Sequence, residues 1–265
     1  TIPFIIMDIH GRIVLWYLPG ILTEEKQQSM CGSLQHLKRN MESKCPKKPS
    51  KSWRQSSEYY KNPGDCQLFP GGLINLSSVV QLGHESLHKS TLLGTGELWL
   101  QSFVETRALM SAILHVAHPA LYGSAQEVLI TLSFTHPSLP IFTVHQSDVT
   151  VLKVWSSVFN VLSIISNQEM PVHLDCLSKA EWYDMLASIE DYNEAILELT
   201  GAGFCFKFDS GTITAFSGKF LNHGVSSCSG EGIYFAYYMR EYVHTMCRVE
   251  TPGWSVPSHD HVMQL

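Results

Sequence analysis

The stretch that decides the fold is a glycine turn followed by a short β-branched and aromatic run, Asp209-Ser210-Gly211-Thr212-Ile213-Thr214-Ala215-Phe216. Gly and Ser before such a run predict a turn that opens a strand. Further segments rich in β-branched and aromatic residues lie on both sides of it, at 128–134, 142–144, 149–161, 162–166, 182–189, 195–208 and 232–242. Short strands separated by turns predict an antiparallel β-sandwich or barrel.

The part of the chain before these strands has the sequence signals of helices and loops. After an extended apolar entry over residues 1–22, Thr23 is a helix cap with Glu24 and Glu25 in the first turn, and the predicted helix runs to about Asn40. Residues 62–96 are rich in loops, and a long helix follows residue 95 and ends before Pro119. Helices first and an antiparallel β core second predict an α+β fold.

We therefore expect a single domain built in three parts. Residues 1–126 form a mainly helical N-terminal part, residues 127–246 form the β core, and residues 247–265 form a tail. The chain starts at Thr1 and not at Met, so we interpret it as a fragment or an excised domain.

Composition excludes several classes of protein. Of 265 residues, 45% are hydrophobic and only 16% are charged, which excludes a disordered chain and a long charged helix. No apolar run approaches the roughly 20 residues that a membrane span needs, so we expect no membrane partner. The seven cysteines contain no CxxC pair, which argues against a disulfide framework and a structural zinc site.

The net charge of −6 argues against a general nucleic-acid binder, but the average hides a local excess. Residues 38–54 hold seven basic residues and one acid, a net of +6, so the rest of the chain carries −12. A solvated loop is the common explanation of such a run. The alternative is a clamp on DNA phosphates, with Lys47, Lys48 and Lys51 as the expected contacts.

One tripeptide carries metal chemistry, His173-Leu174-Asp175. Residues two apart on a strand point to the same face, so His173 and Asp175 can bind one metal ion. His223, which follows the strand over 212–216, is the candidate third ligand. Two imidazoles and one carboxylate form the facial triad of non-haem Fe(II) oxygenases. Taken by itself, a His-x-Asp tripeptide is more often a polar pair at a strand end.

Arg240 ends the apolar strand that follows His223 and shares a strand face with Tyr238, Ala236 and Tyr234. An arginine in apolar surroundings is costly without an anion, and its planar fork suits a carboxylate. In an Fe(II) oxygenase that anion is the distal carboxylate of 2-oxoglutarate. The alternative is a surface arginine after an edge strand.

The order of these features resembles the double-stranded β-helix, a jelly-roll or cupin-like core, of Fe(II)/2-oxoglutarate dioxygenases. Several blocks sharpen the resemblance to fungal TET/JBP-type enzymes, such as those of mushroom-forming fungi: residues 8–20, 73–77 with 83–84, 116–122, 165–184 and 235–240. These blocks follow one another through most of residues 8–244, which makes the resemblance far more specific than the tripeptide.

The resemblance implies oxidation of the methyl group of 5-methylcytosine in double-stranded DNA to hydroxymethyl, formyl and carboxyl forms. Fe(II) is then held by His173, Asp175 and His223, Arg240 binds 2-oxoglutarate, and O2 is consumed. The base is flipped out of the duplex, and the enzyme is expected to be nuclear and monomeric. Asn160 and Asn167 are further candidates for contacts with 2-oxoglutarate, and His244 is a candidate for a base edge or, alternatively, a surface histidine at a strand end.

Two other functions stay open. N6-methyladenine is the main rival target, because the same chemistry acts on an N-methyl group. Demethylases of the AlkB type place a second arginine six residues after the first, where this chain has Met246. From a different class, the chain is an inactive DNA-binding module derived from a transposon, against which the intact triad and Arg240 argue. His259-Asp260-His261 is interpreted as part of the tail.

Overall fold

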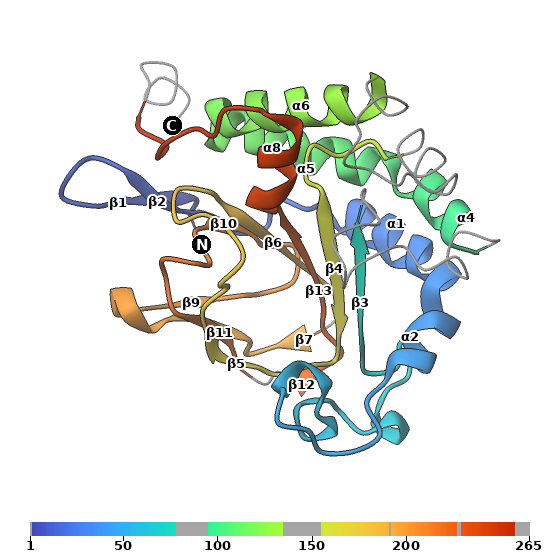
Figure 1. Cartoon of the computed structure of the whole chain (residues 1–265). Coiled ribbons are helices and arrows are strands. Elements are labelled where there is room, and N and C mark those ends of the chain that lie inside the picture. Colours follow the sequence, from blue (N-terminus) through green and yellow to red (C-terminus); the bar gives the residue numbers. More distant parts are fainter. Residues whose placement is uncertain (1, 78–94, 135–154, 191, 227–228, 258–265) are drawn as a thin grey trace.

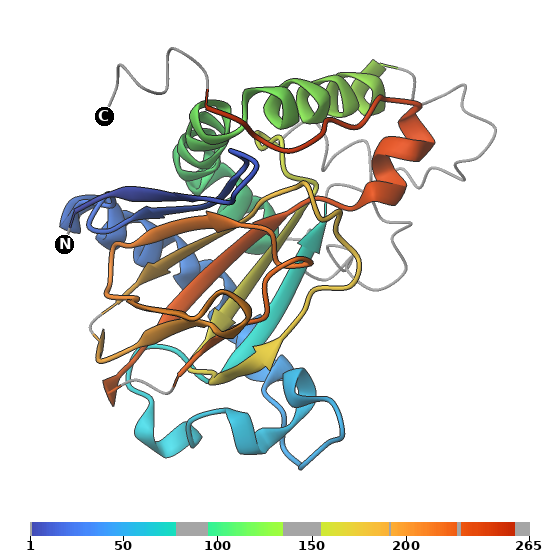
Figure 2. The same cartoon turned by 90° about the vertical axis from the view of Figure 1, so that its left-hand side faces the viewer.

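The computed structural model describes residues 2–77, 95–134, 155–190, 192–226 and 229–257. Its core is a pair of antiparallel sheets with helices on one side (Figures 1 and 2). The large sheet has the strand order β1 (Phe4–Met7), β2 (Ile13–Leu18), β10 (Ile213–Phe216), β6 (Asp184–Ile189), β13 (Ile233–Tyr238), β4 (Val161–Ser166) and β3 (Gly72–Ser77). The small sheet has the order β5 (Met170–His173), β11 (His223–Val225), β8 (Ile196–Leu199) and β9 (Phe204–Lys207).

The remaining elements cover and connect these sheets. The described helices are α1 (Glu24–Leu34), α2 (Lys38–Lys44), α4 (Thr95–Ser102), α5 (Val104–Ala117), α6 (Pro119–Phe134) and α8 (Glu241–Cys247). Single 3-10 turns are η1 (Gln35–Leu37), η2 (Trp53–Gln55), η3 (Ser57–Tyr59), η4 (Pro63–Asp65) and η6 (Thr200–Ala202), and β7 (Tyr192–Asn193) pairs with β12 (Ser229–Gly230). Among the described helices, none is long and apolar enough to cross a bilayer.

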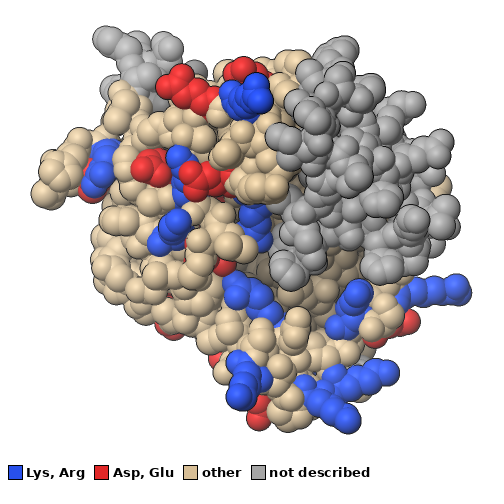
Figure 3. Space-filling model, viewed as in Figure 1, with Lys and Arg blue, Asp and Glu red and all other residues tan. Residues whose placement is uncertain are grey.

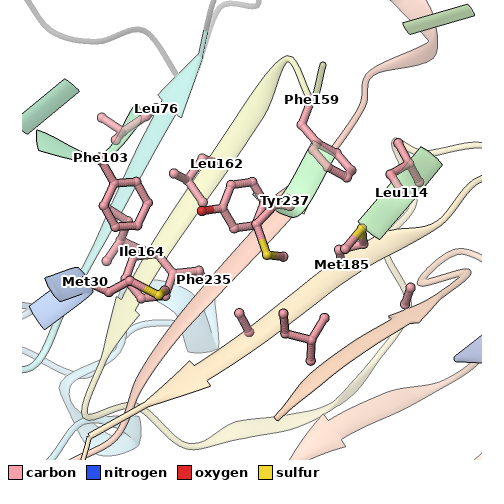
Figure 4. Packing of buried hydrophobic residues seen from close by; sticks show 14 of the residues in the cluster. Met30, Leu76, Phe103, Leu114, Phe159, Leu162, Ile164, Met185, Phe235 and Tyr237 are labelled. Carbon is pink, nitrogen blue, oxygen red and sulfur yellow. The ribbon is translucent and has the colours of Figure 1, made fainter. Parts of the chain in front are cut away.

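The large sheet is buried on both faces, and the alternation along β13 makes this visible. Ile233, Phe235 and Tyr237 pack on the helical side, whereas Tyr234 and Ala236 pack toward the small sheet. Figure 4 shows the helical side, where side chains of β13 and β4 lie among those of the helices, including Met30 of α1 and Leu114 of α5. Burial of this many apolar side chains is the main stabilising term of the fold. The pair of antiparallel sheets with helices on one side confirms the α+β prediction and the double-stranded β-helix core.

Local signals at the N-terminus were read correctly. Residues 2–22 contain the hairpin of β1 and β2. The Thr23 hydroxyl accepts a hydrogen bond from the Lys26 backbone N–H at 3.2 Å, and Glu24 and Glu25 lie in the first turn of α1. The helical path continues through η1 and α2 to Lys44, a little further than the predicted end at Asn40.

Residues 128–134 were predicted as a strand, and this prediction is wrong. They form the second half of α6, which begins at Pro119, a residue that suits the first turn of a helix. Leu121, Ala125, Val128 and Leu132 are buried at a spacing of four, three and four residues, which is the period of a helix. Val128 and Leu132 pack with Val243 and Cys247 of α8, and this packing overrides the intrinsic preference of the β-branched residues.

The expected division at residue 127 is not a structural boundary. The N-terminal part supplies β1, β2 and β3 to the large sheet, where β2 pairs with β10 and β3 pairs with β4. β3 falls inside 62–96, a range that we predicted to be rich in loops. The tail is also packed in part, because the Ile13 N–H donates to the Ser255 carbonyl at 2.8 Å.

Most of the other predicted strands are present with shifted ends. The range 195–208 is a hairpin of β8 and β9, and the strand predicted over 232–242 stops at Tyr238, after which α8 begins. The predicted strand at 142–144, the residues 149–154 and His259-Asp260-His261 lie outside the described residues.

Candidate active site

The three predicted ligands meet at one point of the small sheet. His173 ends β5 and His223 begins β11, and these strands pair in a register that sets the two histidines opposite each other. Their ring centroids are 4.3 Å apart. Asp175 Oδ1 lies 3.8 Å from His173 Nε2, and Asp175 Oδ2 lies 3.6 Å from His223 Nε2. The three donor atoms all lie within 4.8 Å of one another.

Both imidazoles are turned so that one nitrogen is available to a metal. His173 Nδ1 donates to the Pro171 carbonyl at 2.7 Å, and His223 Nδ1 donates to the Leu221 carbonyl at 3.0 Å. A ring nitrogen that donates to a carbonyl carries the proton, so Nε2 of each neutral ring holds a free lone pair. This second contact is typical of histidines that bind metals. The donor set therefore fits a divalent transition metal such as Fe(II).

The charges of the triad are strongly coupled. Burial, followed by the nearby His223, lowers the pKa of His173 to about 4, so this ring is neutral near pH 7. Burial alone would also lower the pKa of His223, but the hydrogen bond and charge of Asp175 outweigh it and the pKa is raised. For Asp175, burial acts upward, and His223, His173 and Arg54 together bring its pKa below the ordinary value. Because a metal binds only the neutral imidazole, metal binding would compete with protonation of His223.

A second carboxyl, that of the buried Asp184 at the start of β6, lies beside the triad. Burial, followed by the charge of Asp175, raises the pKa of Asp184. Its Oδ1 accepts a hydrogen bond from the Ser178 hydroxyl at 3.2 Å. Both carboxylates approach Gly218 closely, because a Cβ at that position would overlap Asp184 Oδ2 and lie 3.1 Å from Asp175 Oδ2.

The triad opens into a cavity of about 360 Å³ between the two sheets. Its floor is largely apolar, with Leu73, Ile165, Met170, Leu186 and Phe216, and Arg240 lines the same cavity. The Arg240 guanidinium lies 4.6 Å from the centre of the Tyr238 ring. The Arg240 backbone N–H donates to Asn160 Oδ1 at 3.0 Å, at the junction of β13 and α8. The cavity thus combines three metal donors with a cation that fits a carboxylate.

Two residues that the metal prediction did not include reach the triad from the basic segment. Arg54 Nη2 donates to Asp175 Oδ1 at 2.9 Å, and the Trp53 ring centroid lies 4.8 Å from that of His173. Arg54 also stacks on Trp53 at 4.3 Å. The sequence held no signal for this contact, because 121 positions separate Arg54 from Asp175. For Asp184 a signal did exist, since it closes a block that resembles the catalytic core.

The other predicted cofactor and base contacts lie elsewhere. Asn160 is buried and holds the backbone of Arg240, so it supports the cation and does not line the cavity. Asn167, at φ 53°, donates to the Phe69 carbonyl at 2.8 Å and accepts from the Gly232 N–H at 3.1 Å, which makes it a turn residue. Its predicted contact with 2-oxoglutarate does not fit this position.

His244 does not face the cavity either. Its side chain is fully buried in α8, and its ring lies 4.4 Å from Trp182. Burial lowers the pKa of His244 to about 4. Neither prediction for this residue fits, because the ring is inaccessible both to a base and to solvent.

Lys47, Lys48 and Lys51 are exposed in the irregular segment between α2 and η2. The two prolines of this segment, Pro46 and Pro49, cannot donate backbone hydrogen bonds, and the segment forms no regular element, as predicted. It leads directly to Trp53 and Arg54 at the cavity. Figure 3 shows Lys and Arg side chains gathered over this lower end of the molecule.

Comparison with known proteins adds a family and a fold. Residues 85–248 match the model of the Tet_JBP family, described as the oxygenase domain of the 2OGFeDO superfamily. No curated protein matches the sequence.

Among solved structures, the chain is similar to NgTET1 in complex with 5mC DNA, with 13% identity over 99% of this chain and 83% of that one and a TM-score of 0.59. A weaker similarity links it to OsALKBH1, with 10% identity over 85% and 96% of the two chains and a TM-score of 0.40. At 13% identity, the similarity to NgTET1 supports the fold of this chain.

Proposed function

The chain belongs to the Tet_JBP family of 2OGFeDO oxygenases, and from this premise we propose that it oxidises the methyl group of 5-methylcytosine in DNA. Enzymes of this superfamily use Fe(II) and 2-oxoglutarate, and the triad of His173, Asp175 and His223 fits the metal. The observation that carries the proposal is that this triad and Arg240 line one cavity.

The chemistry supplied by the bound metal and 2-oxoglutarate is activation of O2 for attack on a C–H bond. The protein supplies positions. Arg240 lines the cavity with its guanidinium against Tyr238, where it can pair with the far carboxylate of 2-oxoglutarate. The Asn160 side chain accepts a hydrogen bond from the backbone N–H of Arg240 and so fixes the position of the Arg240 backbone. Apolar walls such as Leu186 and Phe216 keep water from the reacting carbon.

A DNA substrate is supported by the cavity and by the charge beside it. A methyl group inside a duplex cannot reach a ligand triad enclosed between two sheets, so the base must leave the stack. Cys176, Leu177 and Ser178, which follow the His-x-Asp, line the cavity and would lie along the flipped base. The exposed lysines 47, 48 and 51 would hold the flanking phosphates. Oxidation would proceed from hydroxymethyl to formyl and carboxyl forms.

The decisive experiment is mass spectrometry of nucleosides from duplex DNA that carries both 5-methylcytosine and N6-methyladenine. The purified chain is incubated with Fe(II), 2-oxoglutarate and O2, with each omitted in turn. We expect oxidised cytosines that depend on all three. Loss of N6-methyladenine alone would establish the rival target, and release of no succinate with either base would leave an inactive DNA-binding module. His173→Ala and Asp175→Ala variants are the controls and should be inert.

Such a substrate also suggests where and how the protein works. We propose that it acts in the nucleus, because double-stranded genomic DNA is there, and that it acts as a monomer, because one chain supplies the triad, Arg240 and the basic segment. Imaging of a fluorescent fusion tests the first proposal. Light scattering of the protein with and without a DNA duplex tests the second.

A further inference from the structure

The two residues of η2 that face the triad, Trp53 and Arg54, touch two different metal ligands. Trp53 lies against the ring of His173, and Arg54 donates to Oδ1 of Asp175. The two residues also stack on each other, so one short turn contacts both ligands of the His-x-Asp.

The three ligands are oriented in different ways. His173 and His223 are each fixed by a carbonyl two residues earlier in their own chain segment. The carboxylate of Asp175 has no such local partner, although its backbone N–H donates to the Gly218 carbonyl at 2.9 Å. Its Oδ2 faces Nε2 of His223, another ligand, whereas its Oδ1 accepts a hydrogen bond from Arg54, far away in the sequence.

Arg54 is held firmly enough to orient another residue. The Tyr60 hydroxyl donates to the Arg54 carbonyl at 2.9 Å, and the Glu169 backbone N–H donates to the Tyr59 carbonyl at 2.8 Å. Tyr60 is itself buried and bridges to Gln168, next to β5. The segment is therefore docked on the chain that leads to His173.

From this arrangement we propose that Arg54 is a positioning residue for the metal centre. By binding Oδ1 of Asp175, it leaves Oδ2 as the single oxygen for the metal, and Trp53 fixes the plane of the guanidinium and the tilt of the His173 ring. A charge-assisted hydrogen bond of this kind is strong and directional. The inference rests on the metal site and not on the identity of the methylated base.

The proposal also changes the picture of the basic segment. Its lysines are exposed, whereas its last basic residue, Arg54, forms an ion pair with a metal ligand. The segment that would hold DNA and the residue that orients the metal ligand are thus joined by two residues, Ser52 and Trp53.

The test measures metal binding directly, without turnover. Metal-free protein is titrated with Mn(II), and the free ion is followed by electron paramagnetic resonance. The visible absorption of the Co(II)-loaded protein reports the coordination of the metal. We expect Arg54→Ala to weaken Mn(II) binding about 10- to 100-fold, as is typical when a partner of a ligand is lost, and to change the Co(II) spectrum. Arg54→Lys, which keeps a charged donor, should restore part of both.

Arg12→Ala is the matched control, because Arg12 forms an ion pair with Asp8 away from the cavity, and it should bind Mn(II) as the wild type does. Should Arg54→Ala fail to fold, as judged by circular dichroism, Arg54→Lys and Trp53→Phe decide, each with a several-fold loss expected. Mn(II) affinity in the folded variants equal to or above that of the wild type would overturn the proposal, and so would an equal loss in Arg12→Ala.

Discussion

His173 and His223 stand opposite each other on paired strands, with their ring centroids 4.3 Å apart, although fifty positions separate them in the chain. The pairing of β5 with β11 sets this distance. Asp175 completes the triad from the turn after β5, with donor atoms within 4.8 Å of one another. The site therefore depends on strand register as much as on the identity of its ligands.

Asp175→Asn should abolish metal binding while the fold stays intact. The substitution keeps the shape of the side chain but removes the negative charge that a divalent ion needs. We expect Mn(II) affinity to fall at least about 100-fold, as measured by calorimetric titration. Asp8→Asn, which changes a carboxylate of the β1–β2 hairpin, is the control and should bind as the wild type does. Tight binding by Asp175→Asn would remove Asp175 from the ligand set.

Arg240→Gln should weaken 2-oxoglutarate and leave the metal in place. A bidentate pair with a carboxylate is worth about 1.5–3 kcal/mol, so the Michaelis constant for 2-oxoglutarate should rise about 10- to 100-fold. Arg240→Lys keeps the charge but loses the planar fork, so its Michaelis constant should lie between those of the wild type and Arg240→Gln. Succinate release gives the constant, and Mn(II) titration checks the metal. A rise in the metal constant of the same size would mean that Arg240 supports the fold and does not bind the cosubstrate.

Replacing Lys47, Lys48 and Lys51 together by Ala should flatten the salt dependence of DNA binding. Each phosphate contact contributes about −0.9 to the slope of log K against log salt, so three contacts predict a slope less steep by about 2.7. Fluorescence anisotropy with a labelled duplex at several salt concentrations measures it. Lys26→Ala, on α1, is the control and should leave the slope unchanged. Equal slopes of log K against log salt for the triple variant and the wild type would mean that these lysines do not contact the DNA.

Gly218→Ala should damage the metal site without removing a ligand. The new Cβ would overlap Asp184 Oδ2 and crowd Asp175 Oδ2 at 3.1 Å and His223 Cε1 at 3.3 Å. Both carboxylates must shift, so we expect Mn(II) affinity to fall at least about tenfold, the lower end of the loss seen when the surroundings of ligands change. The matched control is Gly123→Ala in α6, where the new Cβ would meet no other part of the structure within 4 Å and alanine favours the helix. Its affinity should be unchanged and its melting temperature should rise slightly.

His244 should make the stability of the metal-free protein depend on acid. Burial lowers its folded pKa to about 4 from 6.5, so the unfolded chain binds a proton in a range where the folded chain does not. The free energy of unfolding therefore falls as the pH drops from about 6.5 to about 4, by on the order of 3 kcal/mol from this group.

Urea unfolding of the wild type and of His244→Gln at pH 7, 6 and 5 measures this effect. Both proteins contain His173, whose pKa is lowered in the same way, so the difference between their slopes isolates His244. We expect a flatter dependence for the variant, whatever its absolute stability. Two parallel curves would contradict the assignment.

Features that depend on residues close together in the chain are predicted correctly from the sequence. Thr23 caps α1 because its hydroxyl meets an N–H three residues on, and residues 213–216 form a strand after the Gly211 turn. His173 and Asp175 do share a site, but not as two residues of one strand, because β5 ends at His173 and Asp175 lies in the loop after it. The wrong prediction at 128–134 also came from a local signal. Its β-branched composition favoured a strand, but the helical spacing of its buried residues decided the structure.

The sequence by itself determined the types of ligand, their order and the α+β class, because these follow from residue chemistry and local periodicity. Only the tertiary structure decided what surrounds the ligands. It joined Arg54 to Asp175, set Asp184 beside the triad, withdrew His244 into the core and made Asn167 a turn residue. These contacts join residues far apart in the chain, and their distances depend on how sheets and loops pack, which no local pattern encodes.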